Sequence, residues 1–275
     1  MCGIFGCVGE KDVSSVIIKG LKRLEYRGYD SAGLCLETDD SNFEILKSSN
    51  SNYPVDVLSK SLEKSKISSN AGIGHTRWAT HGPINNINTH PHFSYSKNIS
   101  IVHNGIVENY DFLSKFLIRK GVNIFSQTDS ELIAHLVDLM LCRKGNLQSA
   151  IFSVSNMLEG SNTVALMSKE IPQTIFGFTT NSSGGLVVGE KNNYRFLSSD
   201  SYALENFCDS VSFTSKDDLV IISNNSLKII DQNNLPTFPK NINLIKDNND
   251  NSDEFKDLQT NFIIEKEISE QNSAL

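Results

Sequence analysis

The sequence predicts an α+β fold in which antiparallel sheets and helices form separate layers. Seven short strand-like runs follow one another between residues 163 and 231, joined by turns too short to hold a helix. Strands joined in this way pair antiparallel, whereas a doubly wound parallel fold needs a helix at each crossover. Three helical patterns precede them, over residues 109–160. This grouping of helices and strands predicts the α+β class.

The amino-terminal part combines two helices with a hairpin. Residues 12–28 place apolar side chains at helical spacing between an aspartate N-cap and a closing glycine. The strand-like runs 32–37 and 43–48 are separated by the turn signal TDDSN, which predicts an antiparallel hairpin. Residues 55–64 predict a second, short helix.

The rest of the chain contains helices, then strands, then a polar tail. Each of the three helical segments joins a polar cap to a periodic apolar face: 109–121, 129–145 and 146–160. The strand-like runs are 163–168, 174–178, 185–190, 194–199, 211–215, 218–223 and 226–231. From about residue 232 the composition shifts to Asn, Asp, Pro and Lys. One domain is therefore expected over residues 2–231, with a linker or hinge tail over 232–275.

Composition excludes several classes of partner. The net charge is −7 and no cluster of Lys and Arg opposes it, so no nucleic-acid partner is expected. Neither a run of about eighteen apolar residues nor a signal peptide is present, so no membrane span is expected. The five cysteines are scattered and form no CxxC pair, which favours free thiols in a cytoplasmic location over a disulfide framework or a zinc site: Cys2, Cys7, Cys35, Cys142 and Cys208.

The chain opens MCGIFG, which places a cysteine directly behind the initiator methionine. One interpretation is a terminal residue with no role, because the first residues of most domains are loosely ordered. The other is a nucleophile. Removal of Met1 would leave Cys2 with a thiol and a free α-amino group, whose pKa near about 7.7–8.0 suits it to accept the thiol proton.

Two histidine-rich motifs follow. In GHTRWATHG, residues 74–82, the planar guanidinium of Arg77 could hold a carboxylate bidentately or form a structural ion pair. NTHPHF adds His90 and His92 at residues 88–93. Neither motif has the spacing of a zinc site, so hydrogen bonding in the core or around a site is expected, and no metal.

Two further motifs each allow a structural and a functional interpretation. Asn104-Gly105 is the strongest short hairpin signal, yet an asparagine amide beside a glycine N–H also suits an oxyanion hole. Asp129 begins a helix, where it could be an N-cap or the partner of a substrate ammonium. A thiol, an oxyanion hole, an arginine and an aspartate together describe a site for an amino-acid amide, and glutamine is the obvious candidate.

The ordered motifs MCGIFG, LKRLEYRGYDSAG, GHTRWATHG, NTHPH, VHNGIVENY and QTDSELIAHL resemble the glutaminase domains of the glutamine–fructose-6-phosphate aminotransferase family, class II amidotransferases of N-terminal-nucleophile hydrolase type. The resemblance implies a four-layer αββα sandwich of antiparallel sheets. It implies a nucleophile at Cys2 and an oxyanion hole at Asn104 and Gly105. The implied substrate-binding residues are Arg77, Trp78, Thr80, His81, Asp129 and Arg27.

The implied activity is hydrolysis of L-glutamine to glutamate and ammonia, with no cofactor. In the family a sugar-isomerase half uses the ammonia to convert fructose 6-phosphate to glucosamine 6-phosphate. The final segment, FIIEKEISEQNSAL, resembles the hinge to that half, and no such half follows in this sequence. The expected partner is therefore that half or a separate synthase subunit, and a homodimer could form through it. The alternatives are a stand-alone glutaminase subunit for another sugar synthase and a non-catalytic glutamine-binding regulatory module.

Overall fold

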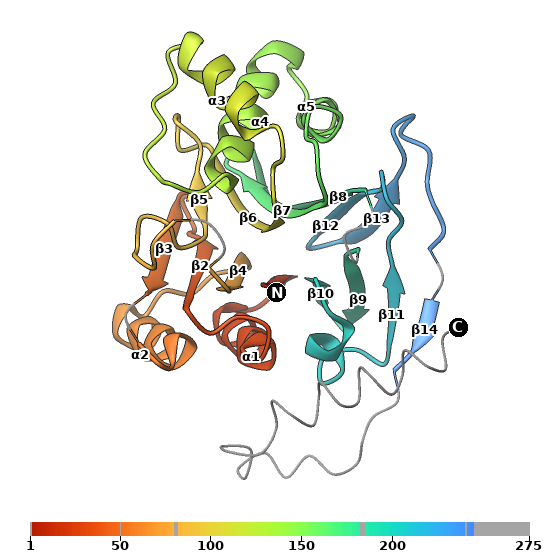
Figure 1. The fold of residues 1–275 in the computed structure, drawn as a ribbon. Helices are drawn as coiled ribbons and strands as arrows, with labels where there is room; N and C mark the ends of the chain where they lie inside the picture. Colours follow the sequence, from red (N-terminus) through yellow and green to blue (C-terminus); the bar gives the residue numbers. More distant parts are fainter. Residues whose placement is uncertain (1, 50, 80–81, 182–184, 240, 245–275) are drawn as a thin grey trace, which may run out of the picture. The chain divides into compact units, whose positions relative to one another are not determined.

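The computed structural model describes residues 2–49, 51–79, 82–181, 185–239 and 241–244. They belong to one compact unit, Met1–Leu244. Two antiparallel sheets stack on each other, and helices cover the outer side of each, so the fold is the expected four-layer αββα sandwich (Figure 1). In the described part of the chain, no helix is long and apolar enough to cross a membrane.

The larger sheet carries the amino terminus of the chain at its centre. Its eight strands among the described residues are, in spatial order, β14 (Asn241–Asn243), β11 (Ser210–Phe213), β9 (Val187–Lys191), β10 (Tyr194–Ser198), β1 (Gly3–Gly9), β4 (Ala71–Arg77), β2 (Ser31–Glu37) and β3 (Phe43–Ser48). Strand β1 pairs antiparallel with both β10 and β4. Cys2 therefore lies at the start of a central strand and is held from both sides.

Helices α1 (Ser14–Leu24) and α2 (Pro54–Ser65) cover the outer side of this sheet. The apolar face of α1 is fully buried at Ile17, Leu21 and Leu24, in one core cluster with Phe5 of β1 and Leu34 of β2. The periodicity of residues 12–28 thus correctly predicts both the helix and its buried face. A short 3₁₀ helix, Ser201–Leu204, packs beside α1.

The second sheet has six strands among the described residues: β13 (Ser226–Ile230), β12 (Leu219–Ser223), β8 (Ile171–Thr180), β7 (Asn162–Ser168), β6 (Ile99–Gly105) and β5 (His92–Phe93). Helices α3 (Tyr110–Arg119), α4 (Ser130–Lys144) and α5 (Leu147–Ser155) cover its outer side (Figure 1). A separate apolar cluster fills the space between the two sheets, with Ile4 and Ile73 of one sheet meeting Val102 and Ile175 of the other.

Two expectations from the sequence are corrected. Asn104-Gly105 does not form a hairpin turn: it ends β6, where Asn104 lies opposite Thr163 and Gly105 opposite Asn162 of β7. Residues beyond 231 are not all linker, because β14 pairs with β11 and Leu244 packs against the core. The polar composition of this stretch did not predict a strand, because a short edge strand needs few apolar side chains.

Candidate active site

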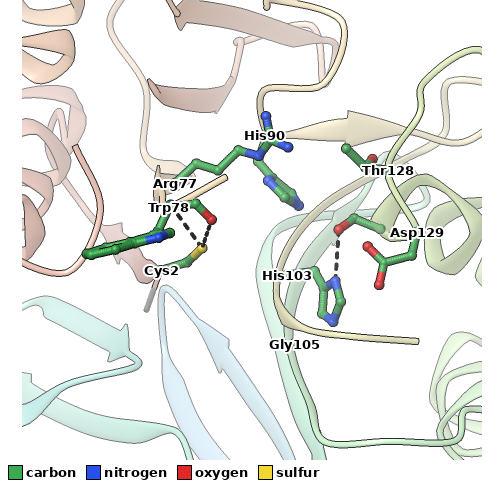
Figure 2. Close-up of a pocket in the computed structure, with 9 residues that line it drawn as sticks. Cys2, Arg77, Trp78, His90, His103, Gly105, Thr128 and Asp129 are labelled. Atoms are coloured by element: carbon green, nitrogen blue, oxygen red, sulfur yellow. Dashed lines mark hydrogen bonds between the residues drawn. The ribbon is translucent and has the colours of Figure 1, made fainter. Parts of the chain in front are cut away.

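The thiol of Cys2 lies at the start of β1 and faces the end of β4. Its Sγ accepts a hydrogen bond from the backbone N–H of Trp78 at 3.2 Å and lies 3.6 Å from the carbonyl oxygen of the same residue (Figure 2). Burial raises the pKa of the Cys2 thiol, and the contact with the Trp78 backbone opposes this only in part. The thiol is therefore protonated at neutral pH and needs a proton acceptor before it can attack.

The amide of Asn104 is oriented toward Cys2. Its Nδ2 donates to the carbonyl oxygen of Cys2 at 2.9 Å, and its Oδ1 lies 3.0 Å from Nε2 of His75. The same Nε2 lies 3.1 Å from the carbonyl oxygen of His103. Because both partners are acceptors, the His75 proton must be on Nε2. Burial lowers the pKa of His75 to about 3, so the ring stays neutral and fixes which end of the Asn104 amide faces Cys2.

Gly105 follows Asn104 and lines the same pocket as Cys2. Its φ of +141° lies in a region that favours glycine, and a Cβ there would lie 2.3 Å from the carbonyl oxygen of Ser161. Only glycine fits this position. Asn104, which bonds the backbone of Cys2, and Gly105, which lines the same pocket, are the residues predicted as an oxyanion hole.

Arg77 and Asp129 line the pocket together with Cys2. Arg77 ends β4, and its guanidinium lies 3.4 Å and 3.5 Å from the carbonyl oxygens of Gly82 and Pro83. Asp129 stands at the N-cap position of α4 but makes no side-chain capping bond; its Oδ2 accepts the Val107 N–H at 2.7 Å. Asp129 is therefore at the predicted N-cap position, but its carboxylate bonds Val107 and lines the pocket instead of capping the helix.

The remaining predicted residues have different locations. Trp78 lines the pocket and is 45 % exposed, with its ring against that of Tyr29 at 5.5 Å. Arg27 is not among the pocket-lining residues, and its Nε pairs with Oδ2 of Asp200 at 2.8 Å. Thr80 and His81 lie outside the described residues.

Buried histidines form the floor of the site. Nδ1 of His103 forms a hydrogen bond with Ser130 Oγ at 2.8 Å. Nε2 of the same ring lies 2.9 Å from Oδ1 of Asn162. Nε2 of His92 contacts Oγ1 of Thr128 at 3.1 Å. The expectation that the histidines of the two motifs are hydrogen bonded is confirmed for His75 and His92 and is wrong for His90, whose ring nitrogens have no partner among the described residues. In the described residues, no group of three metal-binding side chains comes together.

The two glycines and the aspartate of the motif YRGYDSAG position this site, a role that sequence reasoning did not assign. A Cβ on Gly28 would lie 2.7 Å from the carbonyl carbon of Arg77, and one on Gly33 would lie 2.1 Å from the carbonyl oxygen of His90. Asp30 Oδ2 accepts the Ala79 N–H at 2.7 Å. The motif therefore allows β2 to approach both β4 and the segment that carries His90.

Comparison with known proteins agrees with this geometry. Residues 75–206 match the model of a family described as glutamine amidotransferase domain. This chain contains a glutamine amidotransferase domain. The matched residues include Arg77, Asn104, Gly105 and Asp129.

Two similar proteins match most of this chain and are themselves much longer than the matched part. The glutamine–fructose-6-phosphate aminotransferase (isomerizing) of Caldanaerobacter subterraneus is 38% identical over 231 residues, which cover 84% of this chain and 37% of that protein. Its namesake from Clostridium perfringens is 34% identical over 275 residues, which cover 100% of this chain and 43% of that protein. The chain thus spans about two fifths of the length of these relatives.

A solved structure shares the fold. The glutamine phosphoribosylpyrophosphate amidotransferase of B. subtilis superposes with a TM-score of 0.69 at 22% identity, covering 83% of this chain and 48% of that one. The four-layer αββα sandwich is thus a fold that this chain shares with a known amidotransferase.

Proposed function

We propose that this chain hydrolyses the side-chain amide of L-glutamine to glutamate and ammonia through a thioester on Cys2. One observation carries the proposal: a thiol, a guanidinium and a carboxylate, those of Cys2, Arg77 and Asp129, line a single pocket. An α-carboxylate complements Arg77, and an α-ammonium complements Asp129. A glutamine bound in this way presents its carboxamide to the thiol.

The first step is removal of the thiol proton. Because burial raises the pKa of Cys2, a nearby base is required. The α-amino group released when Met1 is cleaved is attached to the same residue, and its ordinary pKa near about 8 allows it to accept a proton at neutral pH. Met1 removal is therefore part of the proposal.

The second step is attack of the sulfur on the carboxamide carbon. The C=O double bond opens and places a negative charge on oxygen, which the Asn104 Nδ2 and the Gly105 N–H stabilise. The proton held by the α-amine passes to the leaving nitrogen, the C–N bond breaks, and ammonia leaves. Water then adds to the thioester carbon, the C–S bond breaks, and glutamate and the free thiol are restored.

The use of the ammonia is also proposed. Two similar proteins are named glutamine–fructose-6-phosphate aminotransferase (isomerizing), and this chain matches about two fifths of their length. We infer that the ammonia serves amination of fructose 6-phosphate to glucosamine 6-phosphate, on a sugar-isomerase half or a separate synthase subunit. Substrate contacts by Thr80 and His81, a homodimer through that half and a cytoplasmic location belong to the same proposal; the last is supported by cysteines that form no disulfide in the described residues.

The test combines the intact mass of the purified chain with an assay of glutamate release from glutamine. A mass lacking Met1 and release that stops after alkylation of Cys2 are expected. Tight glutamine binding without release would favour the regulatory module instead. Neither binding nor release by a folded chain that lacks Met1 would contradict the proposal.

A further inference from the structure

The imidazole of His90 lines the pocket yet makes no hydrogen bond. Its side chain is buried, with 4 % of the residue exposed. Both ring nitrogens, Nδ1 and Nε2, have no hydrogen-bond partner among the residues that the structure describes. Figure 2 draws the ring between Arg77 and His103, on the opposite side of the pocket from the Cys2 thiol.

The position of this ring is fixed by its neighbours. It packs against the rings of His75 and His92, at centroid distances of 4.1 Å and 4.7 Å. The backbone of His90 lies close against β2. Its carbonyl oxygen fits there only because residue 33 is glycine and has no Cβ. Rotation of the ring toward bulk water is therefore blocked, and its polar atoms must find partners inside the pocket.

Unpaired buried nitrogens cost free energy, and native proteins rarely leave both polar atoms of one side chain without a partner. The neighbouring rings of His92 and His103 do have protein partners, Thr128, Ser130 and Asn162. The third neighbouring ring, His75, is bonded through Nε2 and lacks a partner only at Nδ1, so among these four rings of the described residues His90 alone has both nitrogens without a partner, as expected of a group that binds a ligand.

We infer that His90 hydrogen-bonds the α-amino-acid head of the bound substrate, directly or through one ordered water. The inference rests on the proposed function. A neutral imidazole carries one donor and one acceptor, which complement the α-carboxylate and the α-ammonium. Arg77 and Asp129 already supply opposite charges to this head, so a neutral third contact adds direction without disturbing the charge balance. His90 is thereby a specificity residue for the amino-acid head.

The test uses protection of Cys2 from alkylation, which needs no turnover. The chain is treated with iodoacetamide, which has no amino-acid head, at increasing concentrations of L-glutamate, and modification of the Cys2 peptide is followed by mass spectrometry. The exposed Cys142 serves as an internal control in every sample. His90→Phe keeps a planar ring against His75 and His92, whereas His90→Gln keeps one donor and one acceptor.

His90→Phe should raise the glutamate concentration for half-protection about tenfold, the loss expected for one hydrogen bond, with the unprotected alkylation rate of Cys2 unchanged. His90→Gln should restore protection to within about threefold of the wild type. Equal protection in His90→Phe and wild type overturns the inference alone. Absence of protection in the wild type overturns it together with the proposed function.

A measurement on the wild-type protein tests the inference even if a variant does not fold. In the wild-type chain labelled with ¹⁵N-histidine, glutamate should shift the ring nitrogen signals of His90. Ring signals that stay in place while Cys2 becomes protected would overturn the inference.

Discussion

The Asn104 side chain is oriented before any substrate arrives. A primary amide can turn over and exchange its oxygen with its nitrogen, and only one orientation offers donors to an oxyanion. The neutral ring of His75 decides between them, because its Nε2 proton faces Asn104 Oδ1. A charge-free, buried imidazole thus supports a donor that must be preorganised to be effective.

Replacement of this donor should reduce turnover strongly. Asn104→Ala is expected to lower kcat for glutamine hydrolysis by about a hundredfold or more, with a smaller change in KM, because the lost interaction develops in the transition state. Steady-state glutamate release measures both constants. A kcat within about threefold of the wild type would leave Asn104 only a structural role at the end of β6.

Replacement of the Cys2 thiol gives a second prediction, about the nucleophile. Cys2→Ala should abolish glutamate release while the melting temperature stays close to that of the wild type, because the side chain is small and only partly buried at the edge of the core. Calorimetry and the glutamate assay on one preparation check both halves. Release by a homogeneous Cys2→Ala preparation would contradict the thioester mechanism.

At the scale of single residues, the sequence predicts the chemical role of a side chain better than the residues that it contacts. Cys2, Arg77, Asn104, Gly105 and Asp129 could be chosen because few residue types serve as nucleophile, oxyanion donor or charged clamp. The ion pair of Arg27 with Asp200 was not predictable, since it joins residues 173 positions apart in the chain. The roles of Asp30 and His90 were missed for the same reason: they depend on which strands become neighbours.

At the scale of elements, the first turn of α4 fixes the loop that precedes the helix and ends at Asp129. Glu131 of this helix accepts hydrogen bonds from the Phe125 and Ser126 backbone N–H groups and from Nε2 of His135. His135 in turn accepts the Tyr95 N–H through Nδ1. One buried carboxylate thus holds the segment before Asp129 and couples it to the β5–β6 turn.

Glu131 should also contribute a pH-dependent part of the stability. Burial alone would raise the pKa of Glu131, but the hydrogen bonds from His135, Ser126 and Phe125 outweigh it and lower the pKa to about 2. A lowered pKa means that the contribution is complete above about pH 4.3, the ordinary value, and is lost as the pH falls toward 2.

Glu131→Gln should therefore lower the melting temperature at pH 7, and the difference from the wild type should shrink below about pH 4.3. Thermal unfolding of both proteins over this pH range measures it. A difference that stays constant down to about pH 3 would show that the charge of Glu131 plays no part.

The close approach of β2 to the His90 segment gives a further prediction. Gly33→Ala should destabilise the fold by about 3 kcal/mol or more and impair glutamine hydrolysis, because backbone would have to move. Gly6→Ala is the matched control on β1 of the same sheet: the nearest atom to its Cβ would be the flexible end of Ile175, at 3.2 Å, and the nearest backbone atom lies 3.7 Å away. Similar melting temperatures for the two variants would contradict the argument.

Helix α1 was predictable because its apolar residues recur at helical spacing on one buried face, and the carboxyl-terminal strands were predictable as apolar runs separated by short turns. Strands β1 and β4 are as fully buried as the predicted strand β7, but glycines interrupt the apolar runs of GIFGCVG and AGIGHTR. Their glycines also read as turns, although Gly72 and Gly74 are needed where Ile17 and Leu21 of α1 pack on the sheet.

At the scale of the whole molecule, the larger sheet is completed by a segment that composition assigns to a linker. The N–H of Leu244 donates to the carbonyl oxygen of Asp209 at 3.0 Å, next to the pairing of β14 with β11. Removal of residues 232–275 should therefore lower the melting temperature of the amidotransferase unit more than removal of 245–275. Circular dichroism melts of both truncated chains, beside the full chain, check this, and equal melts would contradict a stabilising role for β14.

The central place of β1 has a consequence for the order of biosynthesis. Strand β1 can acquire its partner β4 after about 70 more residues have been made, but its partner β10 only after about 190, on the order of 10–40 s at ordinary synthesis rates. Until then β1 has one unpaired side, and Cys2 is not yet held from both sides. A segment fused ahead of Cys2 would leave the amine of the proposed mechanism in a peptide bond.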